Sequence, residues 1–162
     1  MVDFRVIDER VMSLSEVPDG DLHDLILYWD SKCAGGAFAL RRSIDPTDIP
    51  KLLGNIRIVD IEPGGVFRFR LYGTKSLNPD RKDMTGLTTL DYEDTGFGDM
   101  VTRHYATVAD DGQARCWHIK AEVDVGVYEF MRAVLPMSRN GDCCDMLLIK
   151  SERLTNKRLL RR

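Results

Sequence analysis

The sequence predicts an α+β fold with a five-stranded antiparallel sheet, helices on one face and an additional N-terminal flanking helix. The first observation is a hairpin, since Asn55 to Glu62 and Val66 to Tyr72 alternate apolar and polar residues around Pro63-Gly64-Gly65. The second is a pair of segments, one on each side of the hairpin, in which apolar residues recur at helical spacing. The third is a run of strand-like segments after the second helix. This order of elements indicates an α+β sheet.

The N-terminal part of the chain falls into two segments. Residues 1–17 have no clean apolar period, so the sequence assigns no secondary structure to this N-terminal arm. From Asp19 or Asp21 to Gly35-Gly36, apolar residues follow a helical period, which predicts the flanking helix over residues 21–34. The apolar stripe of this helix either docks on a partner or packs on its own sheet, or does both. The stripe consists of Leu22, Leu25, Ile26, Trp29 and Cys33.

The hairpin and the turn before it have clear local signals. Asp45 is placed to cap a short helical turn that begins at Pro46. Alternation along the strand Val66 to Tyr72 places its side chains in two sets on opposite faces. The set expected to face a core is Phe67, Phe69 and Leu71. The set expected to face solvent, or to be covered by acidic or aromatic side chains, is Arg68, Arg70 and Tyr72.

The second half of the chain begins with an irregular segment and continues with a helix. Lys75 to Asp94 is rich in turn-forming residues, which favours loops and short helical turns. Apolar residues at helical spacing predict a helix from Phe97 to Ala109. The middle one of the later strands is apolar on both faces, as is typical of a strand covered on both sides. The three expected strands are Arg115 to Asp124, Val127 to Pro136 and Cys143 to Ile149.

Several of these pieces together resemble a known family. They are IDPTDIPKLLGNIRIVDIEPGG from Ile44 to Gly65, FRFRLYGT from Phe67 to Thr74, Met84-Thr85-Gly86, Tyr28-Trp29, and Leu135-Pro136-Met137-Ser138. In order and spacing they resemble single-domain PAS proteins of the alphaproteobacterial type. The resemblance implies a PAS-like sheet in one domain over residues 18–150, with the segment after the hairpin walling a ligand pocket. It also implies a stand-alone sensory or interaction module in signalling, which binds a small ligand, a protein partner, or both.

Composition and charge narrow the classes of partner. The 162 residues carry a formal net charge of −3, and this charge does not favour nucleic acid as a partner. The chain has no run of about 18 apolar residues and no signal-peptide pattern, so we expect a cytoplasmic protein that does not bind membranes. Residues 151–162 form a basic C-terminal tail, which we expect to be a solvated chain end. A homodimer or a protein partner remains the expected assembly.

The sequence contains no recognisable catalytic or metal-binding pattern. We therefore expect a protein that is not an enzyme, with no metal and with neither haem nor flavin as cofactor. Four cysteines, at 33, 116, 143 and 144, lack metal-binding spacing and are expected to be reduced thiols. His104 is the one histidine on a buried-looking stripe. Two alternatives stay open: a small cup-shaped enzyme of the isomerase or dehydratase kind, with His104 as its base, and a structural assembly subunit.

The predicted fold suggests two groups of functional residues, a pocket lining and a dimer or partner face. A pocket between sheet and helix would be lined by side chains that a dry core would also use. The expected pocket residues are Phe67, Phe69, Leu71, Met100, His104, Trp117 and Ile119. The expected dimer or partner face consists of Leu22, Ile26, Trp29, Arg68, Arg70 and Tyr72.

Overall fold

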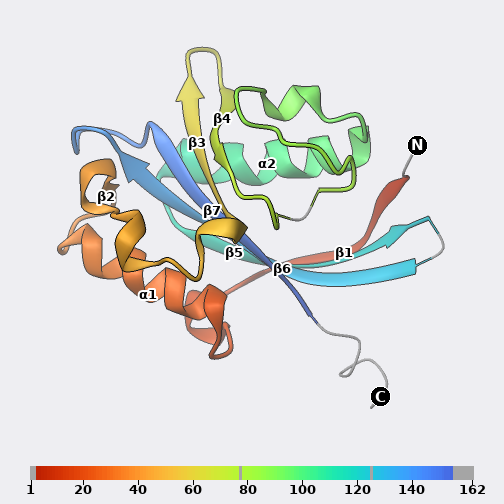
Figure 1. Ribbon diagram of the computed structural model, residues 1–162, viewed down its shortest axis with the longest axis horizontal. Coiled ribbons are helices and arrows are strands. Elements are labelled where there is room, and N and C mark those ends of the chain that lie inside the picture. The colour runs from red at the N-terminus through yellow and green to blue at the C-terminus, as the bar shows by residue number, and fades with distance from the viewer. Residues whose placement is uncertain (1–2, 77, 125, 155–162) are drawn as a thin grey trace.

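A single large sheet organises the protein in the computed structural model, which describes residues 3–76, 78–124 and 126–154 (Figure 1). The strands are β1 (Phe4–Met12), β2 (Ala39–Leu40), β3 (Ile56–Glu62), β4 (Val66–Tyr72), β5 (Arg115–Val123), β6 (Gly126–Ser138) and β7 (Met146–Arg153). Six of them form an antiparallel sheet in the order β1-β5-β6-β7-β3-β4, and β2 adds to β6 in parallel. The helices are α1 (Asp21–Cys33) and α2 (Thr95–Asp111). Short 3₁₀ turns lie at Leu14–Glu16, Arg41–Ser43, Pro46–Asp48, Leu53–Asn55 and Thr89–Asp91. The α+β class with a large antiparallel sheet is confirmed.

The two helices cover opposite faces of the sheet and create two separate cores. Alternation along β6 shows the division, because Leu135 packs into the core under α1 whereas Val134 packs into the core under α2. Figure 1 shows α1 in the lower half of the molecule and α2 in the upper half, with the strands between them. The predicted flanking helix therefore lies on the face that α2 leaves uncovered.

Capping residues mark both ends of α2, whereas α1 begins after Gly20 without a side-chain cap and ends at Ala34 in the left-handed conformation. The carboxylate of Asp94 accepts a hydrogen bond from the amide of Phe97 and caps the first turn of α2. Gly112, with φ of 68°, ends α2 in the left-handed conformation, and its amide donates to the carbonyl oxygen of Val108. In the short turn that begins at Pro46, the side chain of Asp45 accepts from the amide of Thr47, as expected.

The β3–β4 hairpin is present as predicted, but one inserted residue changes its faces. Gly64 and Gly65 both have positive φ in the connecting turn. On β3, Ile58 and Val59 are opposite Leu71 and Phe69, so Arg70 is an extra, bulged residue. The bulge reverses the alternation after Phe69. Tyr72 therefore enters the core under α2 and Leu71 leaves it, the reverse of the prediction.

The sequence pattern assigned no element to residues 1–17, whereas in the structure Phe4–Met12 forms β1 along β5. The sheet therefore exceeds the predicted five strands, and β2 enlarges it further. A bulge at Ile7, between the pairs of Val6 and Asp8, interrupts the alternation that would have revealed this strand. As a result Phe4 packs under α2 and Met12 packs under α1, although their positions differ by an even number, which in a regular strand would place both on one face.

Two further segments define the periphery of the sheet. Gly86 and Leu87 lie along the outer edge of β4, where the Phe69 amide donates to the Leu87 carbonyl and the Phe69 carbonyl accepts from Gly86, at 2.8 and 2.7 Å.

The last strand begins at Met146, later than predicted, because the turn after β6 extends to Asp145. Of the predicted basic tail, residues 151–153 end β7, while residues 155–162 lie outside the described part of the chain.

Candidate ligand-binding site

A pocket of about 290 Å³ opens on the α2 side of the sheet. Its apolar lining is formed by Phe4 of β1, Phe97 of α2 and Phe130 of β6. The rings of Phe4 and Phe97 meet edge to face with centroids 5.1 Å apart. The other walls come from the loop after β4, the β5–β6 hairpin and the end of β7. They are provided by Asn78, Pro79, Arg81, Val123, Tyr128 and Arg153.

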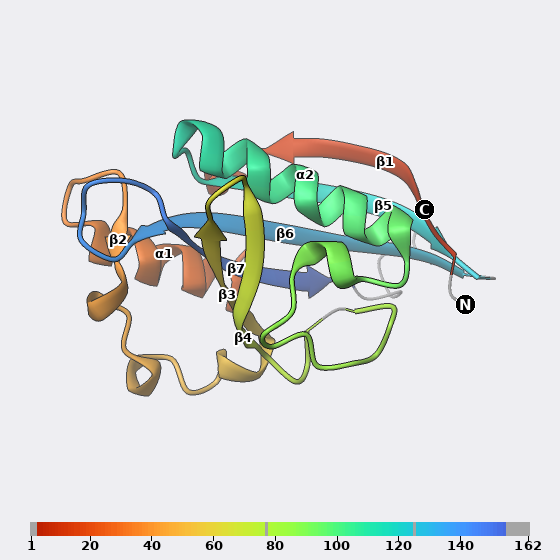
Figure 2. The same ribbon diagram turned by 90° about the horizontal axis from the view of Figure 1, so that it is seen from above.

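The loop between β4 and α2 holds Arg81 at this pocket. Asn78 closes a turn, because its Oδ1 accepts from the amide of Asp80 at 2.9 Å and its Nδ2 donates to the carbonyl of Lys82 at 2.6 Å. Arg81 adopts a φ of 55°, a conformation that is rare for residues other than glycine. The carboxylate of Asp80 accepts from the amide of Glu93 at 2.7 Å and so ties the loop to the start of α2. The green loop in Figure 2 runs beside this end of α2.

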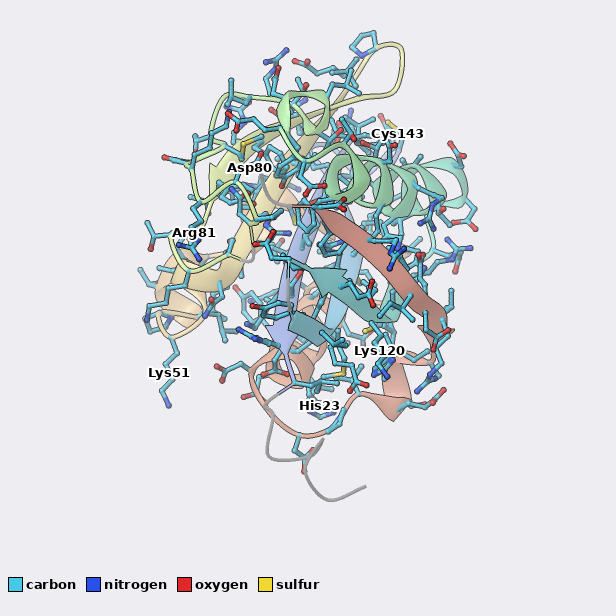
Figure 3. All side chains as sticks on the ribbon, turned by 90° about the vertical axis from the view of Figure 1, so that its right-hand side faces the viewer. His23, Lys51, Asp80, Arg81, Lys120 and Cys143 are labelled. Carbon is cyan, nitrogen blue, oxygen red and sulfur yellow. The ribbon has the colours of Figure 1, made fainter. Side chains whose placement is uncertain are left out.

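A second pocket of about 330 Å³ adjoins the first and shares Asn78 and Arg81 with it. Tyr72 lines this second pocket, and its hydroxyl lies 3.1 Å from that of Tyr92. In Figure 3, Arg81 projects from the loop well away from His23, which lies on α1 at the bottom of the view. One short loop thus contributes to both pockets on the α2 side.

A buried polar network lies next to the first pocket. The imidazole of His104, which is 0% exposed, stacks on the indole of Trp117. Its Nε2 lies 2.7 Å from the carboxylate of Glu9, and its Nδ1 accepts from a guanidinium nitrogen of Arg132 at 3.3 Å. Arg103 donates twice to the same Glu9 carboxylate, at 2.6 and 2.9 Å. The network joins α2 to β1, β5 and β6.

The electrostatics of this network keep His104 neutral. Burial, followed by the charge of Arg132, lowers the pKa of His104 to about 3. Hydrogen bonding from Arg103 lowers the pKa of Glu9 to about 2. The geometry agrees with these values, because a neutral ring protonated at Nε2 donates to Glu9 and accepts from Arg132 at Nδ1.

Most of the residues predicted to line a pocket lie in the core under α2. Six of the seven are buried under α2: Phe67, Phe69, Met100, His104, Trp117 and Ile119. Leu71 is the exception, because the bulge at Arg70 turns its side chain outward and leaves Leu71 36% exposed. None of the seven lines the pocket of about 290 Å³, which lies beside this core.

The residues predicted to meet a partner are divided by the structure. Leu22, Ile26 and Trp29 are buried between α1 and its own sheet, where Trp29 donates to the carbonyl of Pro136 at 2.9 Å. The structure therefore shows the apolar stripe of α1 packed on its own sheet. Arg68 and Arg70 lie on the outer side of β4 and form ion pairs with Glu62 and Asp60. Tyr72 faces the core under α2.

Sequence reasoning missed the most unusual groups of the site, the fully buried Arg132 and Arg57. A signal for Arg132 was present, because a cation in the middle of a strand that is apolar on both faces has no solvated side to occupy. Arg57 occurs at an inward position of the alternating strand β3, opposite Tyr72. Arg81 and Asn78 lie in an irregular loop, where no periodic signal marks a residue as part of a pocket.

Other expectations about chemistry can be compared with the described residues. In these ranges no three His, Cys, Asp or Glu side chains gather as a metal site would require. The four cysteines are free thiols, of which Cys143 is exposed. No helix within the described ranges has the length and apolar character needed to cross a membrane. The predictions about cofactors remain predictions.

The fold and the site define a mixed α+β domain in which an antiparallel sheet, a helix and an irregular loop enclose a pocket, consistent with a PAS-like fold. Residues 20–86 match a family model described as a PAS domain. The match extends from α1 through the β3–β4 hairpin and includes the loop residues Asn78 and Arg81, so the resemblance to PAS domains is confirmed for this part of the chain. No match was found among curated proteins. None was found among solved structures.

Proposed function

We propose that the protein is a stand-alone PAS-like sensory module of the cytoplasm that binds a small ligand and signals as a homodimer or through a protein partner. The pocket of about 290 Å³ carries this proposal, because an aromatic lining with a few polar groups around it is the usual composition of a small-molecule site. The PAS match over residues 20–86 supports a sensory or interaction role.

The position of the pocket provides a route from ligand to response. A molecule in it would touch β1 at Phe4, α2 at Phe97 and the loop at Arg81 simultaneously. A ligand that binds one packing of these elements better than another shifts their equilibrium by its differential affinity. Arg68 and Arg70, on the outer side of the neighbouring strand β4, are the part of the predicted partner face that solvent reaches.

An enzymatic function with His104 as base has less support. The imidazole is 0% exposed, and both of its nitrogens are engaged by Glu9 and Arg132. A base needs hydrogen-bond reach to a substrate proton, and this ring has no open nitrogen to offer. We therefore propose recognition rather than catalysis.

Native mass spectrometry of the protein purified from its own host tests the proposal. The expected result is a retained small molecule whose mass disappears under denaturing conditions. Val123→Trp should displace it, because Val123 lines the pocket, whereas the matched Val127→Trp lies outside the pocket at a 43% exposed position and should retain it. Protein that carries no small molecule and gains no thermal stability from any metabolite pool would contradict ligand binding. The same spectra report whether the protein is a dimer.

A further inference from the structure

Arg132 is a buried cation whose hydrogen bonds go to neutral groups. Its Nε donates to the hydroxyl of Ser151 at 3.2 Å, and its Nη1 donates to His104 at 3.3 Å. Within the described ranges its Nη2 is buried and has no hydrogen-bond partner. A guanidinium taken out of water without a counter-charge is costly, so such a group is normally paired with an anion.

A second buried cation lies on the same face of the sheet. Arg57 of β3 is 1% exposed, and its guanidinium lies 5.0 Å from the ring centroid of Tyr72. A single strand, β7, separates β3 from β6, which carries Arg132. Burial and the nearby charge of Arg57 lower the pKa of Arg132 to about 10. The interior of this face therefore has a positive field that favours an anion.

Arg132 lies directly against the lining of the pocket. Its guanidinium carbon is 5.5 Å from the ring centroid of Phe97 and 5.5 Å from that of Phe130. Both rings line the pocket of about 290 Å³. The pocket thus has an apolar surface with a buried positive charge immediately behind it.

Two more arginines are part of the pocket itself. Arg153 lies over the ring of Tyr128, with its guanidinium carbon 4.1 Å from the centroid, and the turn after Asn78 holds Arg81. Among the described residues, neither Arg81 nor Arg153 has a carboxylate within ion-pair distance. Asp124 is the one carboxylate among the described residues of the lining, which therefore carry an excess of positive charge.

We propose, building on the ligand-binding function above, that this pocket binds a small organic carboxylate with an aromatic or aliphatic body. The apolar body would lie on Phe97 and Phe130. The carboxylate would accept hydrogen bonds from Arg81 and Arg153, whose planar guanidinium groups match it in geometry. Arg132 would act from behind the rings as a positioning charge. The pocket volume lies at the lower end of ligand pockets, about 300–1,000 Å³, which favours a small acid.

Three probes distinguish this chemistry from its alternatives: phenylacetate, its neutral isostere phenylacetamide, and inorganic phosphate. Calorimetry and thermal unfolding of the full chain are measured with each probe up to about 10 mM, which is ten times a millimolar dissociation constant. We expect phenylacetate to bind and to raise the unfolding temperature, with an affinity that falls as salt is added. We expect phenylacetamide and phosphate to bind at least about tenfold more weakly, since each lacks one part of the recognised structure.

Variants assign the binding to the pocket. Arg81→Gln and Arg153→Gln should each weaken phenylacetate binding by about tenfold, because each removes a charged hydrogen bond. Arg42→Gln, at an exposed arginine on the Arg41–Ser43 turn, is the matched control and should leave the affinity unchanged. Arg132→Met replaces the buried charge by an apolar chain of similar length. It should lower the response to phenylacetate while leaving unfolding without ligand unchanged or shifted upward.

The outcomes separate this inference from the proposed function. Equal binding of phenylacetate and phenylacetamide, or full affinity in both glutamine variants, would overturn the carboxylate while leaving a ligand site in place. The same holds if phosphate binds as well as phenylacetate, or if the molecule retained from the host is neutral. Failure of all three probes, together with host protein that carries no small molecule, would remove both proposals.

Discussion

The imidazole of His104 stacks on the indole of Trp117, with ring centroids 3.9 Å apart and ring planes 8° from parallel. His104 comes from the middle of α2 and Trp117 from β5, so the stack fixes the position of the helix on the sheet. Glu9 and Arg132 hold the edge of the same imidazole from two further strands. Four elements therefore meet at one neutral, fully buried ring.

Replacing His104 should test how much stability this junction provides. His104→Ala removes a buried ring and leaves Arg132 and Glu9 without one hydrogen bond each, so we expect a loss of about 3 kcal/mol in the free energy of unfolding. Urea unfolding followed by Trp fluorescence measures it. His23→Ala on α1 is the control and should change stability by less than about 0.5 kcal/mol. Equal effects of the two substitutions would show that the ring provides no special stability.

The lowered pKa of His104 predicts how stability depends on pH. The ring takes up a proton near pH 6.5 when the chain is unfolded but only near pH 3 when it is folded, so the unfolded state binds more protons between these values. The free energy of unfolding should therefore decrease as the pH is lowered through this window, by about 2 kcal/mol between pH 7 and pH 5. Glu9, whose pKa is lowered to about 2, adds a further loss below about pH 4.5. His104→Gln should reduce the decline between pH 7 and 5; an identical slope in the variant would contradict the assignment.

The indole nitrogen of Trp29 offers a test of how α1 is attached. It donates to the carbonyl of Pro136 at 2.9 Å, so Trp29→Phe leaves that buried acceptor without this donor and removes part of the packed ring. We expect a cost of about 2 kcal/mol in chemical unfolding, without a change in oligomeric state. Leu27→Ala, on the same helix but 55% exposed, should cost less than about 0.5 kcal/mol. A change of oligomeric state in Trp29→Phe alone would indicate instead that Trp29 belongs to a partner interface.

Asp94 links the start of α2 to the start of β1. One carboxylate oxygen accepts from the amide of Phe97 at 3.0 Å and the other from the amide of Phe4 at 2.8 Å. Asp94→Ala should therefore destabilise the protein by about 2 kcal/mol and increase hydrogen exchange at both amides. Asp45→Ala, which removes the cap of an exposed turn, should cost about half as much and leave those amides protected. Unchanged exchange at Phe4 in Asp94→Ala would contradict the link.

The four cysteines should differ in reactivity. Burial raises the pKa of Cys33 to about 11, that of Cys116 to about 12 and that of Cys144 to about 11, whereas Cys143 is exposed. Because the thiolate is the reactive form, iodoacetamide at about pH 8 should modify one site quickly and the others slowly. Intact-mass kinetics would show a single fast addition that Cys143→Ser abolishes. Two fast additions would contradict the expected difference in reactivity between Cys143 and the buried thiols.

The elements that could be predicted are those whose pattern is local and uninterrupted. The alternation on either side of Gly64-Gly65 predicted the hairpin, and the apolar stripe from Leu22 to Cys33 predicted both α1 and the face that it buries. β1 could not be recognised, because the bulge at Ile7 places Phe4 and Met12 on opposite faces. Apolar and polar residues that alternate with a period of two predict a strand only where no β-bulge inserts an extra residue.

The candidate site was harder to predict than the fold, for a related reason. Reading the sequence placed Leu71 inside and Tyr72 outside, whereas the bulge at Arg70 exchanges them. The pocket also depends on Arg81, whose placement comes from the turn chemistry of Asn78 rather than from any apolar period. Arg132 was the one member with a visible signal, a charge in the middle of a buried strand.

The two borders of this sheet limit how it can grow. At one border the backbone of Phe69 is already bonded to Gly86 and Leu87, and at the other β1 is bent at Ile7 and carries charged side chains such as Arg5 and Arg10. Blocked, bent and charged borders discourage the addition of strands from other molecules and so protect against aggregation. Self-association of this chain would therefore have to proceed through side chains on its surfaces, not by extending the sheet from one copy into the next.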